Sequence, residues 1–174
     1  VTVARLYNHQ KRIDRIINTV RDLKLKGKTD RFDWAIVGDG PDHQSIKEMI
    51  YEYGLEDIIT LTGLQINPYP YMKYADVFVL PSQYEGYGMT IKEAQILGTP
   101  TIVTDFGPAQ ETVDEMKNGI ICENSDGALT GVIEEVLDNP GMLEQMKMYL
   151  KKNPVTNEIV IRQFYEVIGH ACEK

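Results

Sequence analysis

The stretch "ADVFVLPSQYEGYGMTIKEAQILGTPTIV", residues 75–103, contains a complete strand, loop, helix and strand pattern. The apolar run "DVFVL" (76–80) and the run "TPTIVT" (99–104) are typical of strands, and a helix is expected to begin near Gly88 or Met89. Two neighbouring strands joined by a helical crossover run parallel, with the helix on one face of the sheet. This segment therefore predicts an α/β fold.

The rest of the chain continues the same alternation of strands and helices. Further strand candidates lie at 1–4, 32–38, 57–63 and 119–123, and apolar residues recur at helical spacing within 13–23 and 46–53. This order predicts a Rossmann-like parallel sheet flanked by helices on both faces. After about residue 125 the pattern is helical only, with breaks expected at "DNPG" (138–141) and "KNP" (152–154), because proline stops helices. An apolar stripe predicts a closing helix over 156–169.

Length and hydropathy bound the class of protein. A chain of 174 residues with 43% hydrophobic content predicts one domain, residues 1–174. No stretch approaches the roughly 18 consecutive apolar residues of a membrane helix, and no signal-peptide pattern is present, so we expect no membrane span and no secretion segment. We expect a cytoplasmic protein. The chain starts in strand-like sequence without Met, which suggests a piece of a longer protein.

The charge distribution is uneven. The net charge of -8 disfavours nucleic acid as a partner. Residues 1–15, however, contain four bases and one acid, so this segment is +3 and the remainder is -11. We therefore expect an anionic ligand to be drawn to the N-terminal segment. Cys122 and Cys172 lie 50 positions apart among three scattered histidines, which indicates incidental thiols rather than a metal site or a disulfide.

Ligands of doubly wound sheets bind beyond the carboxyl ends of the strands, so the loops there are the candidate binding segments. The loop "RLYNHQKR" (5–12) places Arg5 and Lys11 before a helix N-terminus, which suits an anion, although solvated surface cations are the alternative. The loop "VGDGPD" (37–42) is a weak phosphate motif because His43 replaces the third glycine of the dinucleotide fingerprint. A tight turn with Asp42 as helix N-cap explains it equally well. The loop "TGLQINPYP" (62–70) either frames a nucleobase through its backbone or simply turns the chain.

The nonapeptide "EGYGMTIKE" (85–93) is the most informative loop. Glu85 lies in the turn before the predicted helix, and Glu93 lies about five residues into it, roughly 7 Å along the axis. Between them the backbone N–H groups of Gly88, Met89 and Thr90 would face an anion at the helix N-terminus. A ligand with hydroxyls at both ends and a diphosphate in the middle, such as a nucleotide sugar, fits this pattern. Acids are also favoured near helix N-termini, so a structural role for both glutamates stays open.

Four stretches in this order, "VARLYNHQKRID", "IVGDGPD", "ADVFVLPSQYEGYGMTIKEAQILGTPTIV" and "QETV", resemble the C-terminal half of a family-4 (group 1) retaining glycosyltransferase of the GT-B fold. The likeness runs from residue 1 to about residue 140. Its strongest element is the signature of two glutamates separated by seven residues, here Glu85 and Glu93. The chain differs from the family at Ala4, where glycine is usual.

The resemblance implies a function and a set of site residues. The function is transfer of a hexose from a UDP- or GDP-linked sugar to a glycan or lipid-linked acceptor, with retention, no metal and no other cofactor, in polysaccharide biosynthesis. It also implies an N-terminal acceptor domain that this chain lacks, so the chain alone should be inactive, and a full-length protein able to lie at the membrane periphery. The implied roles are Glu85 beside the transferred sugar, as nucleophile or as positioning group, Glu93 on the ribose, Arg5 and Lys11 on the diphosphate, backbone contacts from Gly88, Met89 and Thr90, and base contacts near Leu64.

Two other classes of function stay open. A non-enzymatic nucleotide-binding or assembly module would carry the same sheet, with Glu85 and Glu93 as ordinary helix-start acids. A GT-B sugar epimerase or phosphorylase domain would share the phosphate contacts, but the spacing of the two glutamates disfavours it. A nicotinamide-dependent dehydrogenase is disfavoured by His43 in the broken fingerprint.

Overall fold

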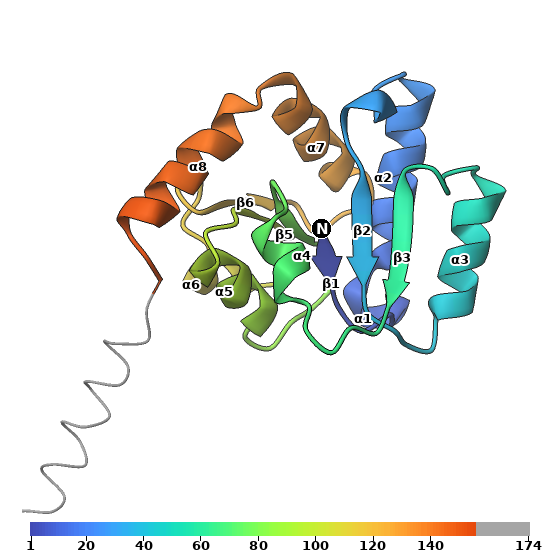
Figure 1. Ribbon diagram of the computed structural model, residues 1–174, viewed down its shortest axis with the longest axis horizontal. Coiled ribbons are helices and arrows are strands. Elements are labelled where there is room, and N and C mark those ends of the chain that lie inside the picture. The colour runs from blue at the N-terminus through green and yellow to red at the C-terminus, as the bar shows by residue number, and fades with distance from the viewer. Residues whose placement is uncertain (156–174) are drawn as a thin grey trace, which may run out of the picture.

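The computed structural model describes residues 1–155 and contains six strands (Figure 1). Each strand falls within one of the six predicted runs, so the strand predictions and the α/β class are confirmed. The observed strands are shorter than the runs because the flanking residues turn into loops. The strands are β1 (Thr2–Val3), β2 (Trp34–Val37), β3 (Ile59–Gly63), β4 (Phe78–Leu80), β5 (Thr101–Thr104) and β6 (Gly119–Cys122).

The strands form two parallel three-stranded sheets, β1-β2-β3 and β4-β5-β6, that adjoin at β1 and β4. The N–H of Val79 donates to the carbonyl of Val1 at 2.8 Å, and the Thr2 hydroxyl donates to the carbonyl of Val79 at 2.8 Å. The spatial order is therefore β3-β2-β1-β4-β5-β6, with the strand order reversing between β1 and β4. In Figure 1 the carboxyl ends of β1, β2 and β3 point to the lower edge of the molecule. The crevice at such a reversal point is where doubly wound sheets bind ligands.

The longer helices confirm the predicted periodicity and the predicted breaks. Helix α5 begins at Met89, and α7 and α8 are separated at the expected "DNPG". The closing helix predicted over 156–169 lies outside the described residues. Sequence periodicity did not reveal the short helices, since four or five residues are too few to show a repeat. The helices are α1 (Asn8–Lys11), α2 (Ile13–Leu25), α3 (His43–Glu52), α4 (Tyr69–Lys73), α5 (Met89–Ile96), α6 (Ala109–Thr112), α7 (Ala128–Asp138) and α8 (Gly141–Lys152), with a 3-10 turn η1 (Thr29–Arg31).

Two hydrophobic clusters lie on opposite faces of the sheet. One packs α2, α3, α7 and α8 against the sheet, and Val79 of β4 belongs to it. The other packs α4, α5 and α6 against the sheet, and Phe78 and Leu80, the neighbours of Val79, belong to it. Successive strand residues point to opposite faces, so this alternation shows that helices cover both faces. The prediction of a doubly wound sheet is confirmed.

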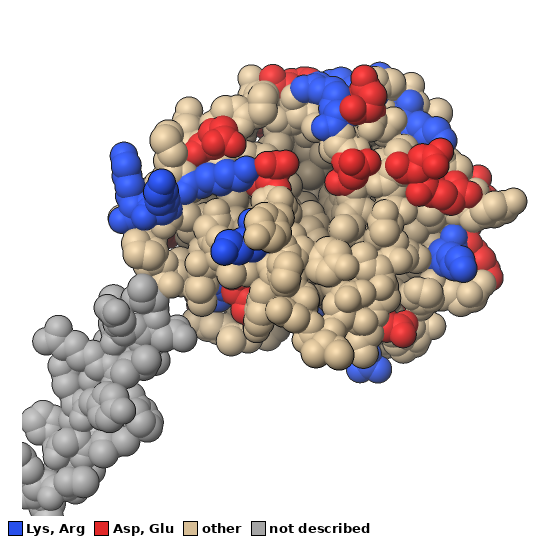
Figure 2. Space-filling view, in the orientation of Figure 1, with Lys and Arg blue, Asp and Glu red and all other residues tan. Residues whose placement is uncertain are grey.

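The surface of the molecule mixes both signs of charge. Figure 2 shows acidic and basic side chains side by side across the upper half of one face, and few charged side chains along its lower edge. Several surface charges of the described residues are paired, as in the contacts of Lys28 with Glu134 and Asp138 at 2.9 Å. Within residues 1–155, none of the helices has the length and apolar character needed to cross a bilayer.

Candidate functional site at the carboxyl edge of the sheet

The loops that follow β1 and β4 meet at the reversal point through one ion pair. The Lys11 ammonium, at the end of α1, lies 2.5 Å from Oε1 of Glu85. The two side chains are only 17% and 8% exposed, so water screens their attraction less than at an open surface. Two groups that lie 74 positions apart in the sequence, both predicted as site residues, are thus in direct contact.

The carboxylate of Glu85 is held from one side. Its Oε1 accepts a second hydrogen bond, from the hydroxyl of Ser82 at 2.6 Å. Within the described part of the chain, no donor is hydrogen-bonded to its Oε2. One carboxylate oxygen is therefore fixed by the protein, and the other is available to a hydroxyl of a ligand. Sequence reasoning did not single out Ser82.

The N-terminus of α5 presents unsatisfied backbone donors beside this carboxylate loop. Gly88 is the N-cap residue in the left-handed conformation (φ 66°), and a Cβ there would lie 2.8 Å from Cδ1 of Ile91. No side chain caps the helix, and in residues 1–155 the N–H groups of Gly88, Met89 and Thr90 donate no hydrogen bond. The positive end of the helix dipole and these free donors favour an anion. The predicted helix start and its three donors are therefore present.

Arg5, Leu64 and Thr90 line a single cleft of about 630 Å³ at this edge. Leu64 is 80% exposed, and Arg5 is exposed with no ion pair among the described residues. Glu93 lies on α5, partly exposed, and within residues 1–155 it makes no side-chain hydrogen bond. Arg5, Leu64 and Thr90 therefore share one cleft, and among the described residues no hydrogen bond joins Glu93 to Glu85.

The glycines of "VGDGPD" serve the packing of the neighbouring loop. A Cβ on Gly40 would lie 2.4 Å from the carbonyl oxygen of Leu6, and one on Gly38 would lie closer still to the carbonyl oxygen of Ala4. Asp42 occupies the N-cap position of α3, but its side chain makes no capping bond. Its Oδ2 instead accepts the N–H of Asn8 at 2.6 Å. Asp42 is therefore the N-cap residue of α3, as predicted, but its carboxylate caps no helix N–H and instead supports the loop that follows β1.

The positive charge of residues 1–15 is largely neutralised inside the protein. Arg12 pairs with Asp14 and Asp126 at 2.9 and 2.6 Å, and Arg15 also pairs with Asp126, at 2.9 Å. Hydrogen bonds from Arg15 and then Arg12 lower the pKa of Asp126. The net +3 of the segment therefore overstates the positive charge that a ligand would meet, since Arg12 and Arg15 are already paired with acids.

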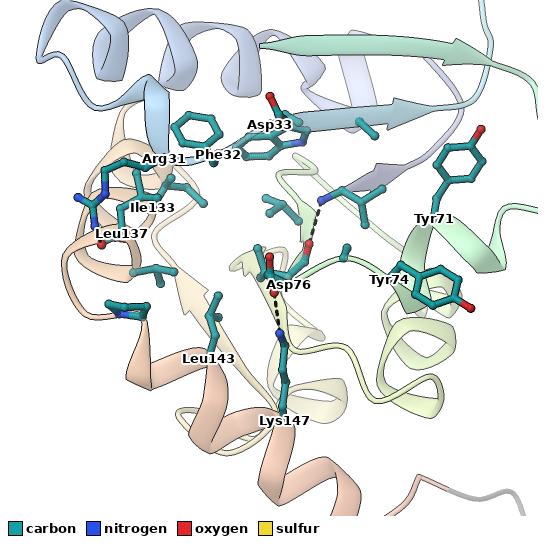
Figure 3. Close-up of a pocket in the computed structure, with 18 of the residues that line it drawn as sticks. Arg31, Phe32, Asp33, Tyr71, Tyr74, Asp76, Ile133, Leu137, Leu143 and Lys147 are labelled. Carbon is teal, nitrogen blue, oxygen red and sulfur yellow. Dashed lines mark hydrogen bonds and ion pairs between the residues drawn. The ribbon is translucent and has the colours of Figure 1, made fainter.

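A second cavity, of about 880 Å³, lies at the opposite, amino-terminal edge of the sheet (Figure 3). Apolar and aromatic residues, including Phe32, Tyr71 and Leu143, line it, and an ion pair of 2.7 Å joins Lys147 to Asp76 on its wall. Sequence reasoning missed this cavity because its lining comes from separate segments without a common motif. We place the candidate site at the carboxyl edge, because the free backbone donors and the shielded Lys11 and Glu85 pair lie there.

The described residues include one of the two cysteines. Cys122, at the end of β6, is buried, and burial raises its pKa to about 11, so the thiol is protonated at neutral pH. This agrees with the prediction of an incidental thiol, while Cys172 lies outside the described residues. Within residues 1–155, no three or more His, Cys, Asp or Glu side chains are grouped as metal ligands.

The sequence matches a family of known proteins. Residues 1–153 match the sequence model of the family described as glycosyl transferases group 1. The alpha-D-kanosaminyltransferase of Streptomyces kanamyceticus is 27% identical over 140 residues, which cover 79% of this chain and 36% of the relative. The lipopolysaccharide core biosynthesis glycosyltransferase LpsD of Rhizobium meliloti is 30% identical over 112 residues, which cover 64% and 33%. The chain thus spans about a third of the length of these curated relatives.

The fold has solved counterparts. The crystal structure of Anabaena HepE in complex with UDP superposes with a TM-score of 0.81 at 19% identity, covering 97% of this chain and 48% of that one. At this identity the likeness establishes the fold alone, and it agrees with the expected Rossmann-like half of a GT-B protein. The family match, which covers nearly all of the described residues, identifies the chain as a member of the group 1 glycosyltransferase family.

Proposed function

We propose that this chain is the donor-binding domain of a glycosyltransferase that moves a hexose from a UDP- or GDP-linked sugar to a glycan or lipid-linked acceptor, with retention of the anomeric configuration. The observation that carries the proposal is the ion pair of Lys11 with Glu85 between the loops that follow β1 and β4, together with the free N–H groups of α5, which begins four residues after Glu85. A cation, a carboxylate and backbone donors in one place match the diphosphate and hydroxyl groups of a nucleotide sugar.

The diphosphate would be bound by Arg5, by Lys11 and by the N-terminus of α5. The ammonium of Lys11 has three N–H donors, and Glu85 takes one of them, so donors remain for phosphate oxygens. Cations and a helix N-terminus stabilise the negative charge that develops on a departing nucleoside diphosphate. On this basis we propose that the transfer needs no metal ion and no other cofactor.

The two carboxylates would bind the sugars on either side of the diphosphate. Oε2 of Glu85 would accept a hydroxyl of the transferred hexose, while Oε1 stays fixed by Lys11 and Ser82. Glu93, further along α5, would accept the ribose hydroxyls. Leu64, in the cleft that also contains Arg5, would contact the base. The UDP bound to Anabaena HepE, a protein of the same fold, supports a uracil base as the first candidate.

The acceptor would be bound by a part of the protein outside this chain. The curated relatives are about three times as long as the segment they share with this chain, which leaves room for an N-terminal acceptor domain. The name of the Rhizobium relative, a lipopolysaccharide core enzyme, supports a role in polysaccharide biosynthesis. The reaction would then take place in the cytoplasm, with the full-length protein at the membrane surface where a lipid-linked acceptor is reached.

Calorimetric titration of the chain with UDP, GDP, UMP and GMP tests the proposal. A donor site predicts that one diphosphate binds at least tenfold more tightly than its monophosphate, because the second phosphate adds charge-assisted hydrogen bonds. Lys47→Ala, which removes an exposed cation from α3, is the control for unspecific attraction between the nucleotides and surface cations. It should leave the affinity for each nucleotide unchanged. Equal affinity for diphosphates and monophosphates would overturn the donor-site assignment.

A further inference from the structure

The loop that carries Glu85 lacks regular secondary structure, yet its backbone is anchored to several other parts of the fold, including Gln10 of α1, whose carbonyl accepts the N–H of Gln83 at 2.7 Å. Three consecutive carbonyl groups, those of residues 81–83, each accept a hydrogen bond from a side chain elsewhere in the chain. The donors are Nη1 of Arg15 in α2 to Pro81 (3.2 Å), Oγ1 of Thr104 in β5 to Ser82 (2.5 Å) and Nδ2 of Asn124, after β6, to Gln83 (2.8 Å).

Arg15 and Asn124 act on this loop together. Arg15 is only 4% exposed, and its Nη1 also donates to Oδ1 of Asn124 at 2.7 Å. Its Nε donates to Asp126 at 2.9 Å, and its Nη2 donates to the side chain of Gln83 at 3.1 Å. The pair of Arg15 with Asp126 adds little net stability, because Asp126 is 72% exposed and water screens its charge. What the pair does provide is a fixed direction for the Arg15 donors that hold the loop.

The anchored backbone continues directly to the site carboxylate. Ser82, whose carbonyl is held by Thr104, uses its hydroxyl to donate to Oε1 of Glu85 at 2.6 Å. Lys11 holds the same oxygen. The position of the Glu85 carboxylate therefore depends on the position of the backbone at residues 81–83.

We propose that Arg15 and Asn124 are positioning residues for Glu85: they hold the loop 81–85 so that the free oxygen of the carboxylate faces the bound sugar. The inference rests on the proposed function, because it takes Glu85 to lie beside the transferred hexose. A displacement of about 1 Å at such a group costs up to about 100-fold in rate, so a rigid loop has a functional consequence.

The first test measures the loop in the chain without ligand. Asn124→Ala removes the donor to Gln83 and the acceptor for Arg15, and it avoids truncating the buried Arg15, which risks unfolding. NMR relaxation of the backbone amides should show increased motion at residues 82–85 in Asn124→Ala. Asn139→Ala is the matched control, since Asn139 also donates to a backbone carbonyl, that of Glu135 at 3.3 Å, but lies between α7 and α8. Unchanged relaxation of the loop in a folded Asn124→Ala variant would overturn the inference.

The second test measures the sugar contact. UDP-glucose and GDP-mannose serve as probes, each compared with its own nucleoside diphosphate by calorimetry. Asn124→Ala should weaken binding of the nucleotide sugar relative to the diphosphate by about fivefold, the size of one lost hydrogen bond. Asn124→Asp should weaken it as much, since a carboxylate still accepts from Arg15 but cannot donate to Gln83. If Asn124→Asp bound the nucleotide sugar as tightly as the wild type does, relative to the diphosphate, Asn124 would act only by pairing with Arg15. That result would contradict the inference.

Glu85→Gln and the double variant with Asn124→Ala separate the two proposals. The quantity compared is the ratio of the affinity for the nucleotide sugar to the affinity for its nucleoside diphosphate. If Asn124 acts through Glu85, this ratio in the double variant equals the ratio in Glu85→Gln alone. Additive losses would show that Asn124 acts elsewhere and would overturn the inference. If neither probe nor either diphosphate binds the wild-type chain, the proposed function fails and the inference falls with it. A reduced ratio in Glu85→Gln combined with a wild-type ratio in Asn124→Ala would leave the proposed function intact and reject the positioning role alone.

Discussion

Lys11→Ala is the substitution whose effect on nucleotide binding follows most directly from the structure. Lys11 is 17% exposed, and one of its three N–H donors is engaged by Glu85 at 2.5 Å. If a remaining donor binds a phosphate oxygen, its loss costs about 1.5–3 kcal/mol, the range for hydrogen bonds to charged groups. Since 1.4 kcal/mol is a factor of ten, the dissociation constant of the preferred nucleoside diphosphate should rise about 10- to 150-fold.

The same substitution also leaves Glu85 without its cation, and this indirect effect must be separated from the direct contact. Glu85 is 8% exposed, so its uncompensated charge would repel a diphosphate nearby. Calorimetry should therefore be repeated for Lys11→Ala in the Glu85→Gln background, where that repulsion is absent. The loss should persist at about 1.5 kcal/mol or more. A loss that disappears in this background would show that Lys11 only neutralises Glu85, and an unchanged affinity in both backgrounds would remove Lys11 from the site.

Further predictions concern α5, the anchored loop and the chain as a whole. Glu93→Gln should weaken binding of the nucleoside diphosphate modestly without changing the unfolding midpoint. If the substitution instead destabilised the fold, and the molecules that stay folded bound the diphosphate as the wild type does, the role of Glu93 would be structural. Gly88→Ala should lower the free energy of unfolding in urea by about 1–3 kcal/mol, because φ is 66° and the new Cβ would lie 2.8 Å from Ile91; wild-type stability would contradict the strain. Because Arg15 and Arg12 lower the pKa of Asp126 below 3.8, its contribution to stability is present above that pH and is lost as the pH falls through the lowered folded-state pKa. Asp126→Asn should therefore flatten the acid limb of a plot of melting temperature against pH, and an unaltered limb would argue against the pairing. Finally, the chain should bind a nucleotide sugar but release no nucleoside diphosphate when an acceptor extract is added, since one half of a cleft cannot align an acceptor; acceptor-dependent release would place the acceptor site within these residues.

The strands and the main helices could be predicted from the sequence because each carries its own local pattern. The runs around Phe78 and Ile102 are short, apolar and bounded by loop residues, and each became a buried central strand. The start of α5 could be predicted because Gly88 precedes a helical segment, and the structure places this glycine in the left-handed conformation. The gathering of the candidate loops at one edge of the sheet could also be predicted, because the carboxyl ends of parallel strands lie at the same edge. This prediction requires no knowledge of side-chain contacts.

Contacts between distant segments could not be predicted in the same way. Composition counted Arg12 and Arg15 as free positive charge, whereas both bind Asp126, more than 100 positions away. Asp42 has the sequence position of a helix cap, but a closer donor, the N–H of Asn8, occupies its carboxylate. The anchoring of Glu85 through Ser82 was missed for the same reason, since a serine in a loop carries no signal of its partner until the strands are placed side by side.

The most direct test of the central claim is a crystal structure of this chain with the nucleoside diphosphate that it binds most tightly. The account predicts the diphosphate at the carboxyl edge, between the side chains of Arg5 and Lys11 and the N–H groups at the start of α5, with the ribose beside Glu93 and the base beside Leu64. Electron density for the nucleotide in the cavity of about 880 Å³ at the amino-terminal edge, with the carboxyl edge empty, would contradict it.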